Sequence, residues 1–197
     1  MFFRRPLPPC SLLTRIFTIL AWFAILLMAA VVVLGLMVGD LHTAPTQDTL
    51  VWARVHRLIG VAAAMVVVLV NSIAVTYFIG TSRWCKEVVD TYSLDRELAR
   101  RSARLKRRTF PWAVMAMLSV VGVSALGAAA DPGTLRPGTE NWVTSHLAAA
   151  LAGLAVVAWA FFVEWNNIFA NHGVISDILA EVKRIRAEHG LDDTSAG

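Results

Sequence analysis

Apolar residues dominate four long stretches of the chain, and very few charges interrupt them. These stretches cover residues 16–39, 55–80, 110–130 and 142–170. Each is long enough to form the helix of about 20 residues that crosses the apolar core of a bilayer. The pattern therefore predicts an all-α integral membrane protein, in which a bundle of four transmembrane helices occupies residues 16–173.

Two further segments predict helical extensions of this bundle. In 81–109 the leucines that follow Ser93 form one narrow stripe, so we expect Ser93 to cap a helix there. In 174–197, isoleucine and valine recur at three- and four-residue steps, which is typical of an amphipathic helix, followed by a short tail. We expect the apolar face of this helix to pack on segment 81–109. A partner protein, another subunit or the membrane surface are the alternatives.

The composition agrees with a membrane protein. Hydrophobic residues make up 57% of the chain and charged residues 16%, and the mean hydropathy is +0.61. A soluble domain keeps about a quarter of its residues charged, and disordered chains combine low hydrophobicity with high charge. Both classes are therefore excluded.

The basic residues predict how the chain is oriented in the membrane. Of the 18 lysines and arginines, 15 lie in segments 1–15, 81–109 and 174–197. Because positive charge collects on the cytoplasmic side, we expect both termini and segment 81–109 in the cytoplasm, with the protein in the inner (plasma) membrane. The basic pI then reflects topology and contact with anionic lipid, and we expect no nucleic-acid partner. Cys10 and Cys85 fall on this reducing side, which favours free thiols.

The second and fourth apolar stretches begin with the same spacing of tryptophan and histidine. Neither stretch contains a motif of soluble enzymes. Trp52-x-x-x-His56 opens one and Trp142-x-x-x-His146 opens the other. Tryptophan favours the membrane–water interface, and four residues of helix rise about 6 Å. The two histidines are therefore expected at one depth near the outer face, on parallel helices. The chain would then consist of two copies of one helical hairpin.

Small and basic residues around the histidines favour a haem. Below each histidine the same helix face carries small residues, among them Gly60 and Gly153, which leave room for a flat cofactor. Neutral histidine is a haem ligand, so we expect His56 and His146 to bind the iron of one haem b. The arginines near this face are suited to the haem propionates, because guanidinium pairs well with carboxylate; they are Arg54, Arg57 and Arg136.

Other readings of these histidines stay open. His42 is a third outer histidine and is an alternative ligand, either of the haem or of a transition-metal site. Histidines near an interface also serve purely structural roles, bonded to water, to a lipid headgroup or to a neighbouring helix.

A second polar cluster is expected towards the cytoplasmic side. Its members are Asn71, Tyr77, Glu164 and Asn167. A carboxylate within a membrane span is costly and marks a functional site by default. We expect either a proton-coupled site or the polar wall of a quinone pocket, with Glu164 protonated or paired with Tyr77, Asn71 or an arginine. The alternative is a carboxylate that reaches interface water or Arg83.

The arrangement resembles four-helix membrane cytochromes b, in its histidines on parallel helices, its adjacent arginines and its short loops. The resemblance implies a small haem b electron-transfer subunit, rather than a stand-alone enzyme. It would pass electrons between an outer redox partner and a quinone or another membrane subunit. The alternatives are a non-enzymatic multi-pass subunit or scaffold that docks a partner through its cytoplasmic helices, and a small proton pathway through Glu164. A homo-oligomer is compatible with each.

Overall fold

The computed structural model describes residues 12–190 of the 197-residue chain. Cys10 and the expected tail beyond Gly190 lie outside these residues. Four helices form most of the described chain: α1 (Leu12–Met37), α2 (Gln47–Thr91), α3 (Arg96–Ala130) and α4 (Val143–Glu188). Two 3-10 turns, η1 (Pro132–Thr134) and η2 (Thr139–Trp142), lie between α3 and α4.

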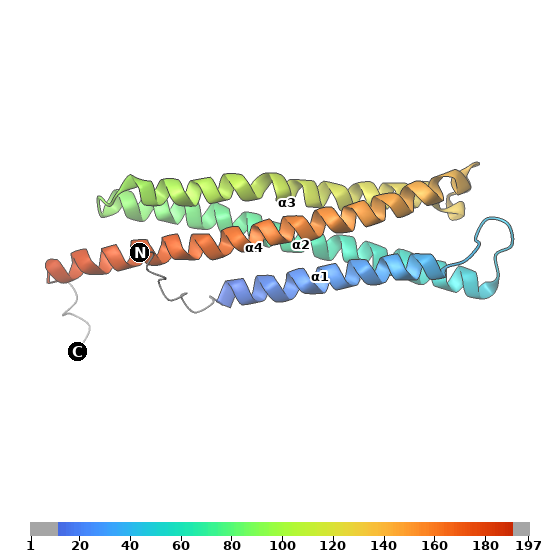
Figure 1. The fold of residues 1–197 in the computed structure, drawn as a ribbon, viewed down its shortest axis with the longest axis horizontal. Coiled ribbons are helices and arrows are strands. Elements are labelled where there is room, and N and C mark those ends of the chain that lie inside the picture. The colour runs from blue at the N-terminus through green and yellow to red at the C-terminus, as the bar shows by residue number, and fades with distance from the viewer. Residues whose placement is uncertain (1–11, 191–197) are drawn as a thin grey trace, which may run out of the picture.

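The four helices form one elongated bundle in which consecutive helices run antiparallel (Figure 1). Each of them is long and apolar enough to cross a membrane, and the all-α prediction is confirmed. We call the end with connections 38–46 and 131–142 the loop end. The opposite end, where α2, α3 and α4 continue past the start of α1, is the extended end (Figure 1).

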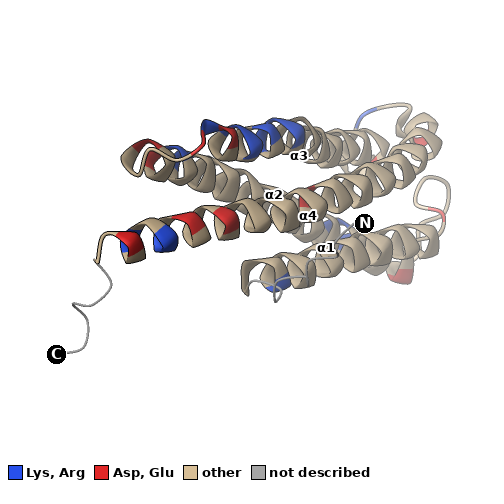
Figure 2. Ribbon diagram, turned by 60° about the vertical axis from the view of Figure 1, so that its left-hand side comes forward, with Lys and Arg blue, Asp and Glu red and all other residues tan. Residues whose placement is uncertain are grey.

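Three helices are longer than the apolar stretches that predict them. Segment 81–109 is no loop, because α2 continues to Thr91 and α3 begins at Arg96, with only a four-residue turn between them. Pro111, which stands at the start of the third apolar stretch, therefore lies in the interior of α3. Proline removes one backbone donor there. Charged residues gather on the extended-end parts of α3 and α4, and the middle of the bundle is almost free of them (Figure 2).

The expected capping role of Ser93 is wrong. Ser93 has a φ of 52°, and the amide of Leu94 donates to the carbonyl of Val89 at 2.9 Å. Ser93 thus occupies the left-handed position that ends α2, which leaves the next helix to start later. Asp95 is the N-cap of α3, and its carboxylate accepts from the amide of Glu97 at 2.8 Å.

The buried positions repeat between the two hairpins. The first and third helices bury residues at steps of four, three and four: Phe17, Ala21, Ala24 and Met28 in α1, and Thr109, Ala113, Ala116 and Val120 in α3. The second and fourth helices also share their steps: Ala63, Val67, Val70, Ala74 and Phe78 in α2, and Gly153, Val157, Ala160, Glu164 and Ile168 in α4. The α1–α2 and α3–α4 hairpins therefore pack in one register, as a repeat predicts.

The extended end has a core of its own, built without α1. Val174 and Ile178 of α4 pack with Cys85 and Val89 of α2, and with Leu94 of the following turn. The expected packing of the C-terminal helix on segment 81–109 is therefore the arrangement found here. An ion pair of 3.1 Å between Arg101 and Asp177 joins α3 to α4 beside this core.

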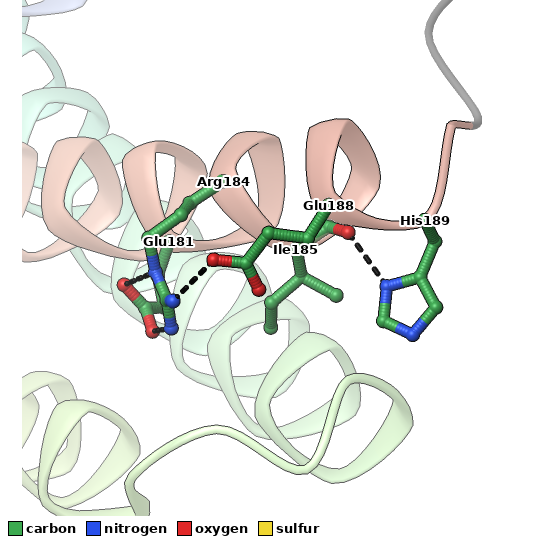
Figure 3. A network of polar contacts seen from close by, with 5 residues as sticks. All are labelled: Glu181, Arg184, Ile185, Glu188 and His189. Carbon is green, nitrogen blue, oxygen red and sulfur yellow. Dashed lines mark hydrogen bonds and ion pairs between the residues drawn. The ribbon is translucent and has the colours of Figure 1, made fainter.

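Beyond this core, the last turns of α4 carry an exposed network of polar contacts (Figure 3). Arg184 pairs with Glu181 at 2.5 Å and with Glu188 at 2.7 Å. The His189 ring is hydrogen-bonded to the Ile185 carbonyl at 2.8 Å, which closes the last turn. These contacts hold helical geometry on the exposed side of the last turns of α4.

A neighbouring pair of residues tests the core of the extended end. Ile178 is fully buried, whereas Leu179 is 52% exposed. Ile178→Asp buries an unpaired carboxylate, so we expect it to lower the free energy of unfolding by about 3 kcal/mol or more. Leu179→Asp, with the same new side chain, should change it by less than about 1 kcal/mol. Denaturation in mixed micelles, followed by tryptophan fluorescence, measures both; equal losses would contradict this packing.

Candidate functional site

The two matched histidines meet at the loop end of the bundle. His56 of α2 and His146 of α4 are both half-buried, and the centroids of their rings are 6.2 Å apart. The planes of the rings are nearly perpendicular, at 80°. The tryptophan that precedes each histidine by four residues is partly exposed, at 42% for Trp52 and 47% for Trp142. The two histidines that the sequence pattern indicated therefore lie close together in the structure.

Each imidazole lies against a glycine of the preceding helix in its own hairpin. A Cβ atom added to Gly35 of α1 would lie 2.9 Å from Cε1 of His56. A Cβ atom added to Gly127 of α3 would lie 2.9 Å from Cε1 of His146. Ordinary Cβ atoms do not approach so closely, so only glycine admits the ring at either place. Sequence reasoning missed this contact, because the position of a glycine in one helix does not show which side chain of the next helix faces it.

A backbone carbonyl one turn before each glycine faces the Nδ1 side of the ring. Nδ1 of His56 lies 3.1 Å from the carbonyl oxygen of Val31. The carbonyl of Val123 is the corresponding group for His146, although no hydrogen bond of ordinary geometry forms there. A proton on Nδ1 that is donated to the carbonyl leaves Nε2 as the free acceptor. In the described part of the chain, Nε2 of neither histidine has a hydrogen-bond partner.

A cavity of about 600 Å³ surrounds the two histidines. All four helices line it, mostly with small or aliphatic side chains. Gly60 is part of this lining, as expected, but Gly153 is not. Gly153 lies deeper and packs on Val123, where an added Cβ would be 2.9 Å from a methyl group. The volume lies within the range of roughly 300–1,000 Å³ that is typical of cofactor and ligand sites.

One of the three expected arginines reaches the cavity. Arg57 lines it and pairs with Asp131, which follows α3, at 2.5 Å. Arg54 and Arg136 are exposed and are not part of the lining. Asp131 also accepts from the amide of Gly133 at 2.8 Å, so the ion pair ties α2 to the second connection of the loop end. Of the residues that the structure describes, Arg57 is therefore the one arginine beside a cavity whose lining is mostly apolar.

His42 also lines the cavity, from the first connection. Its Nε2 is buried without a hydrogen-bond partner. Asp40 holds the turn, because its carboxylate accepts from the hydroxyl and amide of Thr43 and from the amide of His42. These contacts lower the pKa of Asp40 to about 2. Within residues 12–190, no three His, Cys, Asp or Glu side chains form a metal-binding group, so the alternative site of His42, His56 and His146 does not assemble.

The second predicted cluster lies nearer the extended end. The amide nitrogens of its two asparagines donate hydrogen bonds. Asn71 donates to the carbonyl of Val67 at 2.7 Å. Asn167 of α4 donates to the hydroxyl of Thr109 in α3 at 3.0 Å. The sequence pattern gave no sign of Thr109, because a single threonine on an apolar helix face has no spacing that marks it.

Tyr77 pairs with Asn171, which follows Glu164 and Asn167 on α4. Asn171 of α4 donates to the hydroxyl of Tyr77 at 3.1 Å and to that of Thr81 at 3.0 Å. Glu164 is fully buried, and neither of its oxygens has a hydrogen-bond partner. None of its expected pairings forms, and Arg83 binds Glu87 instead, at 2.8 Å.

Comparison with models of known protein families, with curated proteins and with solved structures finds no match. The function must therefore be argued from the two clusters themselves.

Two glycines of α3 test the close packing of the histidines. A Cβ atom added to Gly122 would have no neighbouring atom within 4 Å. A Cβ atom added to Gly127 would lie against the His146 ring. Gly122→Ala should leave the bundle as stable or stabilise it by up to about 1 kcal/mol, because alanine is the better helix former. Gly127→Ala should destabilise it by about 1–3 kcal/mol through overpacking. Unfolding in mixed micelles measures the difference. Equal behaviour of the two variants would contradict the contact.

Proposed function

We propose that the protein is a small membrane-embedded haem b subunit that transfers electrons, in which His56 and His146 would hold the iron of one haem. The separation of the two rings carries this proposal. An iron bonded to both imidazoles at about 2 Å, the usual length of a metal–histidine bond, separates their centroids by roughly 6 Å. The observed separation is 6.2 Å.

The surroundings of the histidines support the same ligand. Metal-binding histidines usually donate their second ring N–H to a carbonyl or carboxylate, which orients the ring. The Val31 carbonyl is in that position for His56. A ring–ring contact alone would also account for a separation of this size. It would not account for a cavity of about 600 Å³ around both rings.

Each residue of the site has a distinct role in this proposal. Haem supplies a reversible one-electron couple when two imidazoles bind its iron. Gly35 and Gly127 let the rings enter, and a mostly apolar lining surrounds them. Arg57 is suited to pair with a propionate, since guanidinium binds carboxylate strongly. Asp131 holds Arg57 at the cavity until then.

The basic residues support a cytoplasmic extended end, by the rule that positive charge stays inside. The haem would then lie near the outer face of the inner membrane, within reach of an outer redox partner. The protein would deliver or receive electrons through another membrane subunit. A quinone at the second cluster has less support, because the amide groups of Asn167 and Asn171 are already bonded to neighbouring helices.

The scaffold alternative has less support than haem binding. It needs an apolar face on the C-terminal helix that a partner can cover. Val174 and Ile178 of that helix already pack against α2 and the turn after it.

An absorption spectrum of the purified protein tests the proposal. We expect a Soret band and a pyridine haemochrome of haem b, with one haem per chain. His56→Ala and His146→Ala should each abolish six-coordinate haem, because each removes one axial ligand. His172→Ala is the matched control, since His172 lies on α4 outside the cavity lining, and this variant should keep the wild-type spectrum.

The measurement is repeated with haem added to the cells or to the apoprotein, so that incomplete loading cannot explain a missing signal. If the folded, haem-supplemented protein shows no haemochrome, the proposal is wrong. A haemochrome that survives in both alanine variants would place the cofactor elsewhere.

A further inference from the structure

Glu164 is the one fully buried acid of the described residues, and the proposed haem site does not use it. Both carboxyl oxygens are enclosed and lack a hydrogen-bond partner. The repeat explains this burial, because Glu164 stands at the α4 position that corresponds to Ala74 in α2. Phe161 and Ile168, one turn away on either side, belong to the apolar core. The carboxyl group therefore sits where the other hairpin has a methyl group.

No charged group of the packed helices compensates this carboxyl. On the helices around it, Arg15 of α1 and Arg108 of α3 are exposed, and Tyr77 of α2 already accepts from Asn171. An ionised carboxylate that is buried without a partner costs far more than a neutral acid.

Further buried oxygens in this part of the bundle also lack donors. The side-chain carbonyl oxygens of Asn71 and Asn171 are enclosed and unpartnered, like the oxygens of Glu164. Their amide nitrogens already donate elsewhere. The region thus holds four buried acceptor oxygens without a partner, and a proton on Glu164 supplies a donor among them.

Polar contacts occupy the positions of α4 that follow Glu164 towards the extended end. Asn167 bonds to Thr109, and Asn171 bonds to Tyr77 and Thr81. The hydroxyls of Ser82 and Ser102 follow, 3.3 Å apart and buried. We call these contacts the polar ladder. It crosses between α2, α3 and α4 in the half of the bundle that lies away from the histidines.

We propose that Glu164 is a proton-binding site, neutral at pH 7, which exchanges its proton with water at the extended end along the polar ladder. Its carboxylate takes one proton from hydronium, which leaves water, and no electron moves. A metal cation fits less well. Hard cations such as Ca²⁺ and Mg²⁺ take about six to eight oxygen ligands. Within the described part of the chain, the buried oxygens without a partner in this region are only the two of Glu164 and one each of Asn71 and Asn171.

The proposed proton site is separate from the proposed haem site. His146 and Glu164 are 18 residues apart on α4, which is about 27 Å of helix at 1.5 Å per residue. Glu164→Gln should therefore keep the haem content of the wild type. A result that contradicts one of the two proposals therefore does not affect the other.

Infrared spectroscopy of the full chain in lipid vesicles tests the protonation state. We expect the absorption of a protonated carboxyl group at pH 7, absent in Glu164→Gln. Glu181→Gln is the control, because Glu181 is ionised in its pair with Arg184 and gives no such band to lose. The same band in Glu164→Gln, or no band in the wild type, would overturn the proposal. A band that appears only when sodium is withdrawn would assign the site to a cation instead.

Transfer into D₂O tests the route. The carboxyl band should shift as the proton is exchanged for deuterium, and Asn171→Leu, which removes the middle of the ladder, should slow this shift at least tenfold. Asn166→Leu is the matched control, since Asn166 is exposed and bonds only within its own helix, at 2.7 Å to Phe162. Equal exchange rates in the two variants would overturn the ladder as the route.

Discussion

The close approach of a histidine to a glycine within each hairpin is the constraint on which the loop end depends. An imidazole can lie against the preceding helix only where that helix has no side chain. The contact fixes how α1 sits on α2 and how α3 sits on α4, in the same way in both hairpins. Since the hairpins also share their buried steps, the two rings arrive opposite each other, in a cavity that neither hairpin forms alone.

The two hairpins differ where the polar chemistry lies. Ala74 and Glu164 are equivalent positions, and so are Asn71 and Phe161. The two hairpins therefore carry the same residues at the histidine positions but different residues at the second cluster. A symmetric half of the bundle is suited to a ligand shared by both hairpins. The asymmetric half carries a buried acid on one hairpin only, so the two clusters differ in their chemistry.

Hydropathy predicted the helices, because a span of about 20 apolar residues is a local property of the chain. The matched Trp-x-x-x-His spacing predicted that His56 and His146 would meet, since both helices run in the same direction. Such patterns do not predict which residues of neighbouring helices contact each other. Arg54 and Arg57 are three residues apart, and only the packing of α2 decides that Arg57 faces the cavity. The αL turn at Ser93 depends on how α2 ends, which the leucine stripe does not encode.

Electron paramagnetic resonance of the oxidised, haem-loaded protein tests the central claim most directly, because it reports both axial ligands and their relative orientation. The ring planes of His56 and His146 are 80° apart. Two imidazoles that are nearly perpendicular give ferric haem a low-spin, highly anisotropic signal, and we expect that signal here. A high-spin signal would show that the two histidines do not both bind the iron. It would contradict the account, and so would a protein that takes up no haem.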